Sequence, residues 1–234
     1  MSIYCVSDIH GCFSEFIELL DIIKFNPDED TLYVLGDVID RGTRPIECLR
    51  YIMRAKGIRL LLGNHEQMMM DFYDFEGIDW SRNGNLITMA QFAALSCLEK
   101  EKILSYLQKR PLYKTLNVCG RRFFLSHAGL DVSVPFKYQH SHDLLWSRPE
   151  FYKNTALSRH ICIFGHTPTP RIRGSKDCSV WFDPRHKDKI NIDCGCVYGG
   201  ALAAIRLDDG ETYYVKSKHG NQSKYCFNRC RLFE

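Results

Sequence analysis

Five short motifs in this chain place Asp, His or Asn beside glycine, each directly after a run rich in apolar residues. They read SDIHG at 7–11, GDVIDRG at 36–42, GNHE at 63–66, SHAG at 126–129 and GHT at 165–167. Taken singly, such a residue is more often a turn or capping residue than a ligand. Five of them in one chain favour a shared metal site, because oxygen and imidazole donors without thiolate suit Mn, Fe or Zn.

The motifs supply six candidate ligands, which are Asp8, His10, Asp37, Asn64, His127 and His166. Asp8 and His10 are two residues apart, and in extended chain this spacing places both side chains on one side. Two carboxylates do not neutralise two divalent ions. A two-metal site of this composition therefore keeps positive charge for an arriving phosphate and lowers the pKa of a bound water.

The elements that must position these ligands alternate in the first half of the chain. Apolar runs predict strands at 3–6, 31–35 and 58–62, and helical spacing predicts helices over 13–23 and between Pro45 and Gly57. This order is typical of parallel strands with helices on their faces. In such sheets, sites form beyond the carboxyl ends of the strands, where each of the five motifs is expected.

The second half has a different pattern. Residues 64–110 are predicted to be mainly helical, and the chain beyond them to be rich in strands with little helix. These strands are expected at 122–125, 161–164, 189–192, 201–207 and 212–216, the last two joined as a hairpin. Without a repeat or linker, residues 1–234 are expected to form one mixed α/β domain with a basic tail from about residue 216.

Composition narrows the classes of function. The chain has 234 residues and a formal net charge of +3, which is too weak to indicate a nucleic-acid partner but suits an anionic substrate. Eleven cysteines without a CxxC pair favour reduced thiols in a cytoplasmic protein over a disulfide framework. No apolar stretch reaches the roughly 20 residues of a membrane span, and the strand-like start indicates no signal peptide. The oligomeric state has no signature in the sequence.

The motif series resembles that of the phosphoprotein phosphatases, a family of metallophosphoesterases. Within the family it resembles small bacterial and phage serine/threonine protein phosphatases of the lambda phosphatase type. The similarity runs from Ser2 to about Leu207, and GDVIDRG and GNHE are its most specific parts. It implies a calcineurin-like domain with a four-layer αββα fold, in which helices flank a central β-sandwich.

The resemblance also assigns roles to residues. It implies that Asp8, His10 and Asp37 hold one divalent metal and that Asp37, Asn64, His127 and His166 hold the other, with Mn expected before Fe or Zn. His65 would be the general acid, oriented and raised in pKa by Asp40, and would contribute about 10²–10⁴-fold. Arg41 and Arg148 would bind the phosphate. The implied reaction is direct in-line attack of a metal-bridging hydroxide on phosphorus.

The main functional expectation is a metal-dependent protein serine/threonine phosphatase acting on a phosphoprotein or phosphopeptide. The alternative is a dinucleoside-polyphosphate or nucleotide hydrolase, because INIDCGCVYGG at 190–200 also resembles bacterial dinucleoside-polyphosphate hydrolases. Asp40 favours the first reading, since symmetrical dinucleoside tetraphosphatases tend to replace that residue. A non-catalytic binding protein is disfavoured by the complete ligand set.

Three further features are open to interpretation. The basic segment 168–188 follows His166 and either borders the substrate or is a solvated loop. Cys194 and Cys196 are predicted to be core thiols rather than a metal pair. Glu66 is expected to face the N-terminus of the helix that follows GNHE.

Overall fold

The computed structural model describes residues 1–74, 80, 83–154, 157 and 159–219. The first half contains β1 (Ile3–Val6), α1 (Phe13–Ile22), β2 (Thr31–Val34), α2 (Pro45–Arg54), β3 (Ile58–Leu60), α3 (Asn64–Asp74), α4 (Leu86–Ala93) and α5 (Cys97–Gln108). The second half contains β4 (Tyr113–Val118), β5 (Arg121–Ser126), η2 (Phe136–Tyr138), α6 (Ser141–Trp146), α7 (Pro149–Asn154), β6 (Ile161–Phe164), α8 (Thr169–Arg173), β7 (Trp181–Phe182), β8 (Lys189–Asn191), η3 (Cys196–Tyr198), β9 (Ala201–Arg206) and β10 (Thr212–Lys216).

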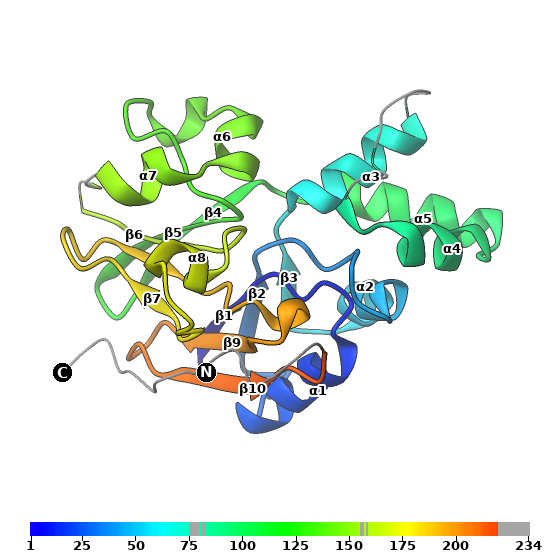
Figure 1. Ribbon diagram of the computed structural model, residues 1–234, viewed down its shortest axis with the longest axis horizontal. Coiled ribbons are helices and arrows are strands. Elements are labelled where there is room, and N and C mark those ends of the chain that lie inside the picture. The colour runs from blue at the N-terminus through cyan, green and yellow to red at the C-terminus, as the bar shows by residue number, and fades with distance from the viewer. Residues whose placement is uncertain (75–79, 81–82, 155–156, 158, 220–234) are drawn as a thin grey trace.

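The strands form two five-stranded mixed sheets, in the orders β10-β9-β1-β2-β3 and β4-β5-β6-β8-β7 (Figure 1). In the first sheet β1, β2 and β3 are parallel, and β9 and β10 are added antiparallel. In the second sheet β5, β6 and β8 are parallel, with β4 and β7 as antiparallel edges. Each sheet therefore has three parallel strands whose carboxyl ends can carry a functional loop.

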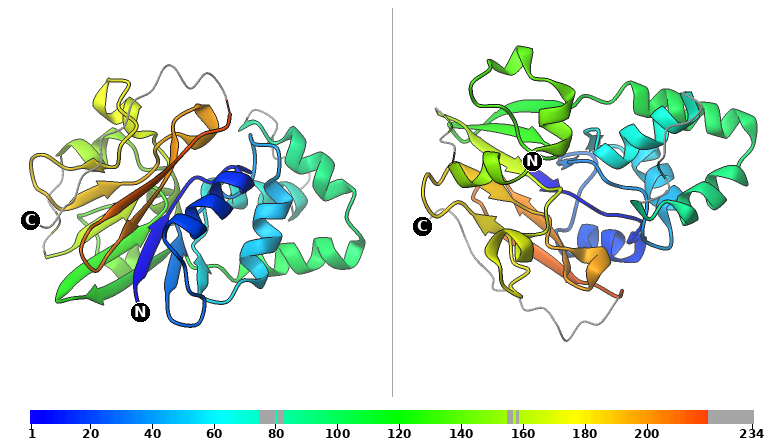
Figure 2. Two further views of the ribbon diagram at one scale, coloured as in Figure 1. Left: turned by 90° about the horizontal axis from the view of Figure 1, so that it is seen from below. Right: turned by 45° about the horizontal axis from the view of Figure 1, so that its top comes forward.

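Alternating side chains join the layers, because successive residues of a strand point to opposite faces. Cys5 of β1, Phe123 of β5 and Ile163 of β6 share one cluster between the sheets. Their neighbours Tyr4 and Phe124 point outward, to clusters that include α1 and α2 on one side and α6 and α7 on the other (Figure 2). The predicted fold is confirmed as two mixed sheets flanked by helices.

The first half follows the sequence prediction closely, and each predicted strand and helix ends within two residues of its observed bound. In the second half, strand β4 was not predicted. Only Val118 of its six residues is buried, so its sequence contains no continuous apolar run. The expectation of little helix was wrong. Helices α6, α7 and α8 have only five or six residues each, which is too short for a helical period to show in the sequence.

The predicted tail begins where β10 ends, at Lys216. Its residues 220–234, which include Lys224, Arg229 and Arg231, lie outside the described residues. Among the helices of the described residues, none combines the length and hydropathy needed to cross a membrane.

Candidate metal centre

The six predicted ligands leave the carboxyl ends of five parallel strands and meet at one edge of the sandwich. Asp8 and His10 follow β1, Asp37 follows β2, Asn64 begins α3 after β3, and His127 and His166 follow β5 and β6. Five are buried and His166 is partly exposed. The structure therefore brings together residues up to 158 positions apart.

Asp37 lies at the centre of this group. Its Oδ2 is 3.5 Å from His10 Nε2 on one side and 3.4 Å from His127 Nε2 on the other. Asp8 Oδ1 lies 4.0 Å from the same His10 nitrogen. A single carboxylate oxygen thus faces both predicted ligand sets, which is the position that a bridging ligand needs.

The second ligand set is closely packed around an amide oxygen. Asn64 Oδ1 lies 2.8 Å from His127 Nε2 and 3.0 Å from His166 Nδ1. His127 Nδ1 donates to the carbonyl of Leu35 at 2.8 Å, so its Nε2 carries a lone pair and faces another acceptor. Two acceptors at this distance repel unless a cation lies between them.

His10 has the same arrangement, because its Nδ1 donates to the carbonyl of Ile39 at 2.7 Å and leaves Nε2 as a lone-pair donor toward the carboxylates. Burial, with the nearby His65 and Arg41 charges, holds the pKa of His10 well below its ordinary value. A neutral imidazole is the form that binds a metal. The donor set therefore fits two divalent ions, which when bound would act as Lewis acids and lower the pKa of a coordinated water.

Carboxylates are concentrated here without an equal number of fixed cations. Burial raises the pKa of Asp37 well above its usual range, and the charges of Asp8 and Glu66 raise it further. Burial and the Asp8 charge also raise the pKa of Asp193, which follows β8, the sixth parallel strand. Buried carboxylates without a counter-ion are unfavourable, so the electrostatics as well as the geometry favour bound cations.

Backbone strain is concentrated at the same residues. Asp8, His10, Asp37 and His166 have φ angles of 51°, 44°, 54° and 68°, in the left-handed region that side chains other than glycine avoid. Each such residue costs about 1–3 kcal/mol and persists where the surroundings over-determine it. The expectation that extended chain aligns Asp8 with His10 was therefore wrong, because the chain turns after β1 and left-handed residues aim both side chains.

Glu66 holds the two central loops together. Its carboxylate accepts the N–H groups of Asp37, Val38 and Ile39 at 2.9, 2.8 and 3.2 Å. It also accepts the N–H of Gly63 at 3.1 Å, next to the start of α3, where the sequence placed it. Gly63 has no room for a side chain, since an added Cβ would collide with the backbone and carboxylate of Asp37. Glu66 thus positions the loop that carries Asp37.

We expect Glu66→Gln to lower the free energy of unfolding by about 2–5 kcal/mol, because the amide end turns two buried N–H groups into unsatisfied donors. Urea denaturation of the chelator-treated protein would measure the change without interference from metal binding. Glu47→Gln is the matched control. Glu47 is 46% exposed and pairs with Arg44 on the surface, so its loss should cost less than about 1 kcal/mol. Equal stability of the Glu66 variant and the wild type would contradict the positioning role.

His65 and Asp40 form the predicted pair. His65 Nδ1 lies 2.6 Å from Asp40 Oδ2, which also accepts the indole N–H of Trp80 at 2.8 Å. Arg41 Nη2 lies 2.8 Å from His65 Nε2, and the same guanidinium donates to His10 Nε2. Asp40 therefore lies where it could orient the His65 ring.

The prediction that the pKa of His65 is raised was wrong for the structure with Arg41 beside the ring. Burial, then the charges of Arg41 and His127, hold the pKa of His65 well below its ordinary value. Burial also raises the pKa of Asp40 to about 6, against the hydrogen bonds from Thr88 and Trp80. The His65 ring is neutral and accepts a hydrogen bond from Arg41 at Nε2. Approach of a phosphate anion would offset the Arg41 charge and favour protonation at that atom.

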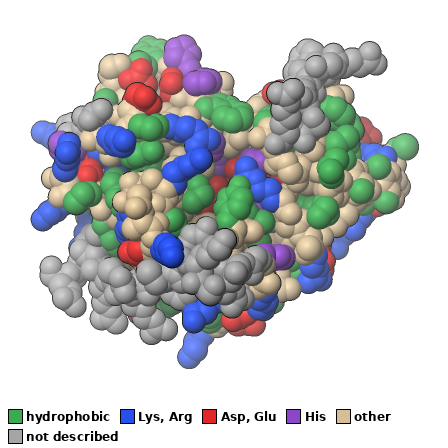
Figure 3. Space-filling view, viewed as in Figure 1, with side chains coloured by type: hydrophobic (Ala, Val, Ile, Leu, Met, Phe, Trp, Pro, Cys, Tyr) green, Lys and Arg blue, Asp and Glu red, His purple; other side chains and the backbone are tan. Residues whose placement is uncertain are grey.

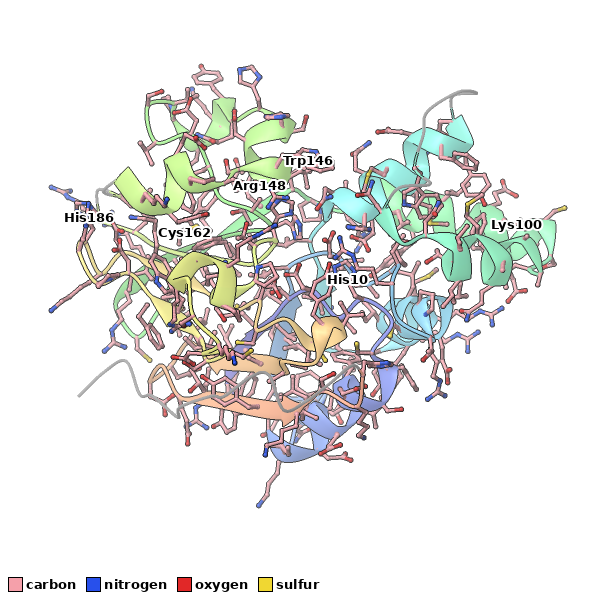
Figure 4. The ribbon with its side chains drawn as sticks, viewed as in Figure 1. His10, Lys100, Trp146, Arg148, Cys162 and His186 are labelled. Atoms are coloured by element: carbon pink, nitrogen blue, oxygen red, sulfur yellow. The ribbon has the colours of Figure 1, made fainter. Side chains whose placement is uncertain are left out.

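A cavity of about 570 Å³ opens beside the ligands. Its lining includes Asp8, His10, Asp193, Tyr198 and three arginines, Arg41, Arg148 and Arg171. Figure 3 shows Lys and Arg side chains gathered around the hollow in the middle of this face. Figure 4 shows Arg148, from the α6–α7 side, and His10, from the β1 side, directed toward the same central region. The cavity thus joins the candidate metal ligands to a strongly positive wall.

The structure shows the surroundings of the basic segment 168–188 and of the two cysteines that the sequence left open. Of segment 168–188, Arg171 lines the cavity, whereas Arg173 donates to the carbonyls of Ser179 and Val180 and supports the loop. Cys194 and Cys196 are both buried, as predicted, and belong to different clusters, so the two thiols do not form a metal pair with each other.

Sequence reasoning missed three residues of the site. Asp193 could have been found by the rule that identified the other ligands, because it also follows a parallel strand. Tyr198, whose ring lies 5.6 Å from the Arg41 guanidinium, and Trp80, which contacts Asp40 across 40 residues, have no local signal.

Comparison with known sequences gives relatives for part of the chain. The symmetrical bis(5'-nucleosyl)-tetraphosphatases of Salmonella typhimurium (strain LT2) and Salmonella newport (strain SL254) are each 31% identical over 131 residues. The matched region is 56% of this chain and 44% of each relative, so the chain matches less than half the length of these proteins.

Solved structures share the fold over nearly the whole chain. A candidate diadenosine tetraphosphatase superimposes with a TM-score of 0.72 at 21% identity, covering 93% of this chain and 94% of that one. A Saccharomyces cerevisiae protein serine/threonine phosphatase gives 0.61 at 16% identity, covering 94% and 81%. The family model for calcineurin-like phosphoesterases matches residues 1–202, and the chain therefore belongs to the calcineurin-like phosphoesterase family.

Proposed function

We propose that this protein is a metal-dependent hydrolase of dinucleoside polyphosphates. The observation that carries the proposal is that three arginines, Arg41, Arg148 and Arg171, line the same cavity as Asp8 and His10. One phosphate group needs one or two guanidinium forks, whereas three offer donors to a chain of phosphates. The tetraphosphatase activity in the names of the Salmonella relatives supports the same substrate class.

The candidate ligands keep the roles that the sequence indicated. We propose that Asp8, His10 and Asp37 hold one divalent ion and that Asp37, Asn64, His127 and His166 hold the other, with Mn²⁺ as the first choice. His65, oriented by Asp40, donates a proton to the leaving oxygen. Tyr198, whose ring is 49% exposed at the cavity, offers an aromatic face to a nucleobase.

The second candidate is the protein serine/threonine phosphatase that the sequence first suggested. The 2.6 Å contact between His65 and Asp40 favours it, because a serine alkoxide is a poor leaving group and needs a proton donor. A nucleotide leaves as a phosphate anion and needs less help. We propose this activity second, because the three cavity arginines and the names of the relatives support the dinucleotide substrate.

Rates on diadenosine tetraphosphate and on a phosphoserine peptide, measured side by side with Mn²⁺, would separate the two. We expect kcat/KM for the dinucleotide to be higher by about 100-fold, equivalent to roughly 2.7 kcal/mol in transition-state stabilisation. Attack at the central anhydride would convert one dinucleotide and one water into two molecules of ADP, which chromatography distinguishes from ATP plus AMP. A higher rate on the peptide would overturn the ranking, and no turnover of either substrate would contradict both proposals.

Arg171→Ala should raise KM for diadenosine tetraphosphate about 10-fold and leave hydrolysis of a small aryl phosphate almost unchanged. The reason is that Arg171, on α8, lines the cavity and would contact only the longer substrate. One charged hydrogen bond of roughly 1.5 kcal/mol accounts for such a factor. Arg185→Ala is the control, since Arg185 belongs to the same segment but lines another hollow. An equal effect on both substrates would place Arg171 at the reacting phosphate instead.

A further inference from the structure

A second group of potential metal ligands lies beside the strand-end site and shares no ligand with it. Cys12 immediately precedes α1, Glu15 is in the first turn of α1, and Cys196 begins η3. Their sulfur and carboxylate ligand atoms all lie within 4.8 Å of one another, and all three residues are buried. The Cys196 thiol is also hydrogen-bonded to Cys12, which together with burial raises the pKa of Cys196.

A fourth donor comes from the end of the described chain. His219 follows β10, its ring is 25% exposed, and its Nε2 lies 3.5 Å from Glu15 Oε1. The same oxygen accepts the backbone N–H of Lys218 at 2.7 Å, as the oxygen of a carboxylate ligand commonly does from its surroundings. Two sulfurs, one oxygen and one nitrogen make up the usual number of donors for a tetrahedral structural zinc site.

We propose that Cys12, Glu15, Cys196 and His219 bind one Zn²⁺ ion. Zinc–ligand bonds of about 2.0–2.3 Å imply tetrahedral ligand separations of roughly 3.4–3.8 Å. The 3.5 Å between His219 and Glu15 already has this value, and the ligand atoms of Cys12, Glu15 and Cys196 need to approach one another by at most about 1.4 Å.

The donor chemistry selects this ion. Thiolates favour Zn²⁺ over Mn²⁺ or Mg²⁺, so the site differs in preference from the oxygen and imidazole ligands at the strand ends. Binding releases the two thiol protons to solvent and leaves two thiolates, one carboxylate and a neutral imidazole around the ion, a net charge of −1. The Lys218 ammonium, 2.8 Å from Glu18, is a nearby positive charge.

The position of the ion would join three distant segments beside the cavity. Cys12 follows the candidate ligand His10 by two residues, and Cys196 is in the loop that brings Asp193 and Tyr198 to the cavity. His219 adds the chain beyond β10. The ion would thus act as a structural clamp that holds the η3 loop against the first ligand loop.

Cobalt substitution tests the site separately from hydrolysis. Co²⁺ bound to thiolate gives a sulfur-to-metal charge-transfer absorption in the near ultraviolet, and the strand-end ligands contain no thiolate. Titration of the fully reduced protein with Co²⁺ should develop this absorption until the thiolate site is filled, and Zn²⁺ should remove it. Cys12→Ser and Cys196→Ser should each abolish the band, whereas Cys97→Ser, at an exposed cysteine on α5, should keep it.

Several outcomes would overturn the proposal. One is the absence of the band in reduced wild-type protein, and another is a band that survives Cys12→Ser and Cys196→Ser, which would assign the metal to other cysteines. A Cys12–Cys196 disulfide in zinc-free protein isolated without reductant would identify a redox pair instead.

His219→Ala provides a test that does not alter the buried thiols. We expect this variant to keep its far-ultraviolet circular dichroism and to bind Co²⁺ at least about 10-fold more weakly, in line with the loss of one of four ligands. Unchanged Co²⁺ affinity would contradict the four-ligand site. Asp37→Asn should leave the charge-transfer band in place, so the failure of this site and the failure of the strand-end site give different results.

Discussion

Replacing Asp37 with asparagine is expected to reduce hydrolysis by on the order of 10³-fold or more and to weaken metal binding at both strand-end sites. Asp37 Oδ2 lies 3.5 Å from His10 Nε2 and 3.4 Å from His127 Nε2, so one carboxylate oxygen faces an imidazole nitrogen of each predicted ligand set. An amide has the same shape but no charge to share between two cations. The Oδ1 atom, which accepts the N–H of His65 at 3.1 Å, can keep its role in the variant.

The measurement is metal content after dialysis, together with kcat on the preferred substrate. Zn²⁺ bound by Cys12 and Cys196 is counted separately, from the charge-transfer band that appears when Co²⁺ replaces it. Asp21→Asn, at an exposed position on α1, is the control and should leave both quantities unchanged. A folded Asp37→Asn protein with two tightly bound metals at the strand ends would refute the bridging role.

His65→Asn is expected to lower kcat by a factor that depends on how readily the leaving group departs. For a phosphoserine peptide the loss should be about 10²–10⁴-fold, the range of general-acid catalysis, because a serine alkoxide requires a proton. For an aryl phosphate or a dinucleoside tetraphosphate the loss should be smaller, since a phenolate or a nucleotide anion departs with less help. The comparison of the three substrates therefore measures proton donation rather than general damage to the site.

Asp40→Asn should follow the same order of losses, because Asp40 holds the His65 ring through the 2.6 Å contact at Nδ1. A useful control is Trp80→Phe, which removes one hydrogen bond to Asp40 Oδ2. Its losses in kcat on the three substrates should have the same order but be smaller. If His65→Asn reduced turnover of all three substrates equally, His65 would be acting through the metals or the fold and not as an acid.

Much of the fold and of the site follows from local sequence patterns. The runs that became β1, β2 and β3 are apolar and β-branched, and the helices between them have clear apolar spacing. Parallel strands place their carboxyl ends at one edge, so the residue types that follow each strand identified all six candidate ligands before any contact was known.

The less regular parts of the chain were not predictable in the same way. Helices α6, α7 and α8 are a turn or two long, and they are held by contacts with the second sheet rather than by their own pattern. The left-handed backbone at Asp8 and Asp37 also runs against local preference, since such residues usually require glycine. Packing around the site compensates for that strain, and a short window of sequence does not contain that packing.

The sequence by itself thus indicated a metallophosphoesterase and the six candidate ligands, because each depends on a short motif next to a strand, and the family resemblance suggested the pairing of His65 with Asp40. Only the tertiary structure decided which charges share the cavity, that His65 is neutral there, and that Cys12, Cys196 and His219 converge on Glu15. These features depend on contacts between residues far apart in the chain. Such contacts exist only after the two sheets have packed together, so the sequence motifs do not display them.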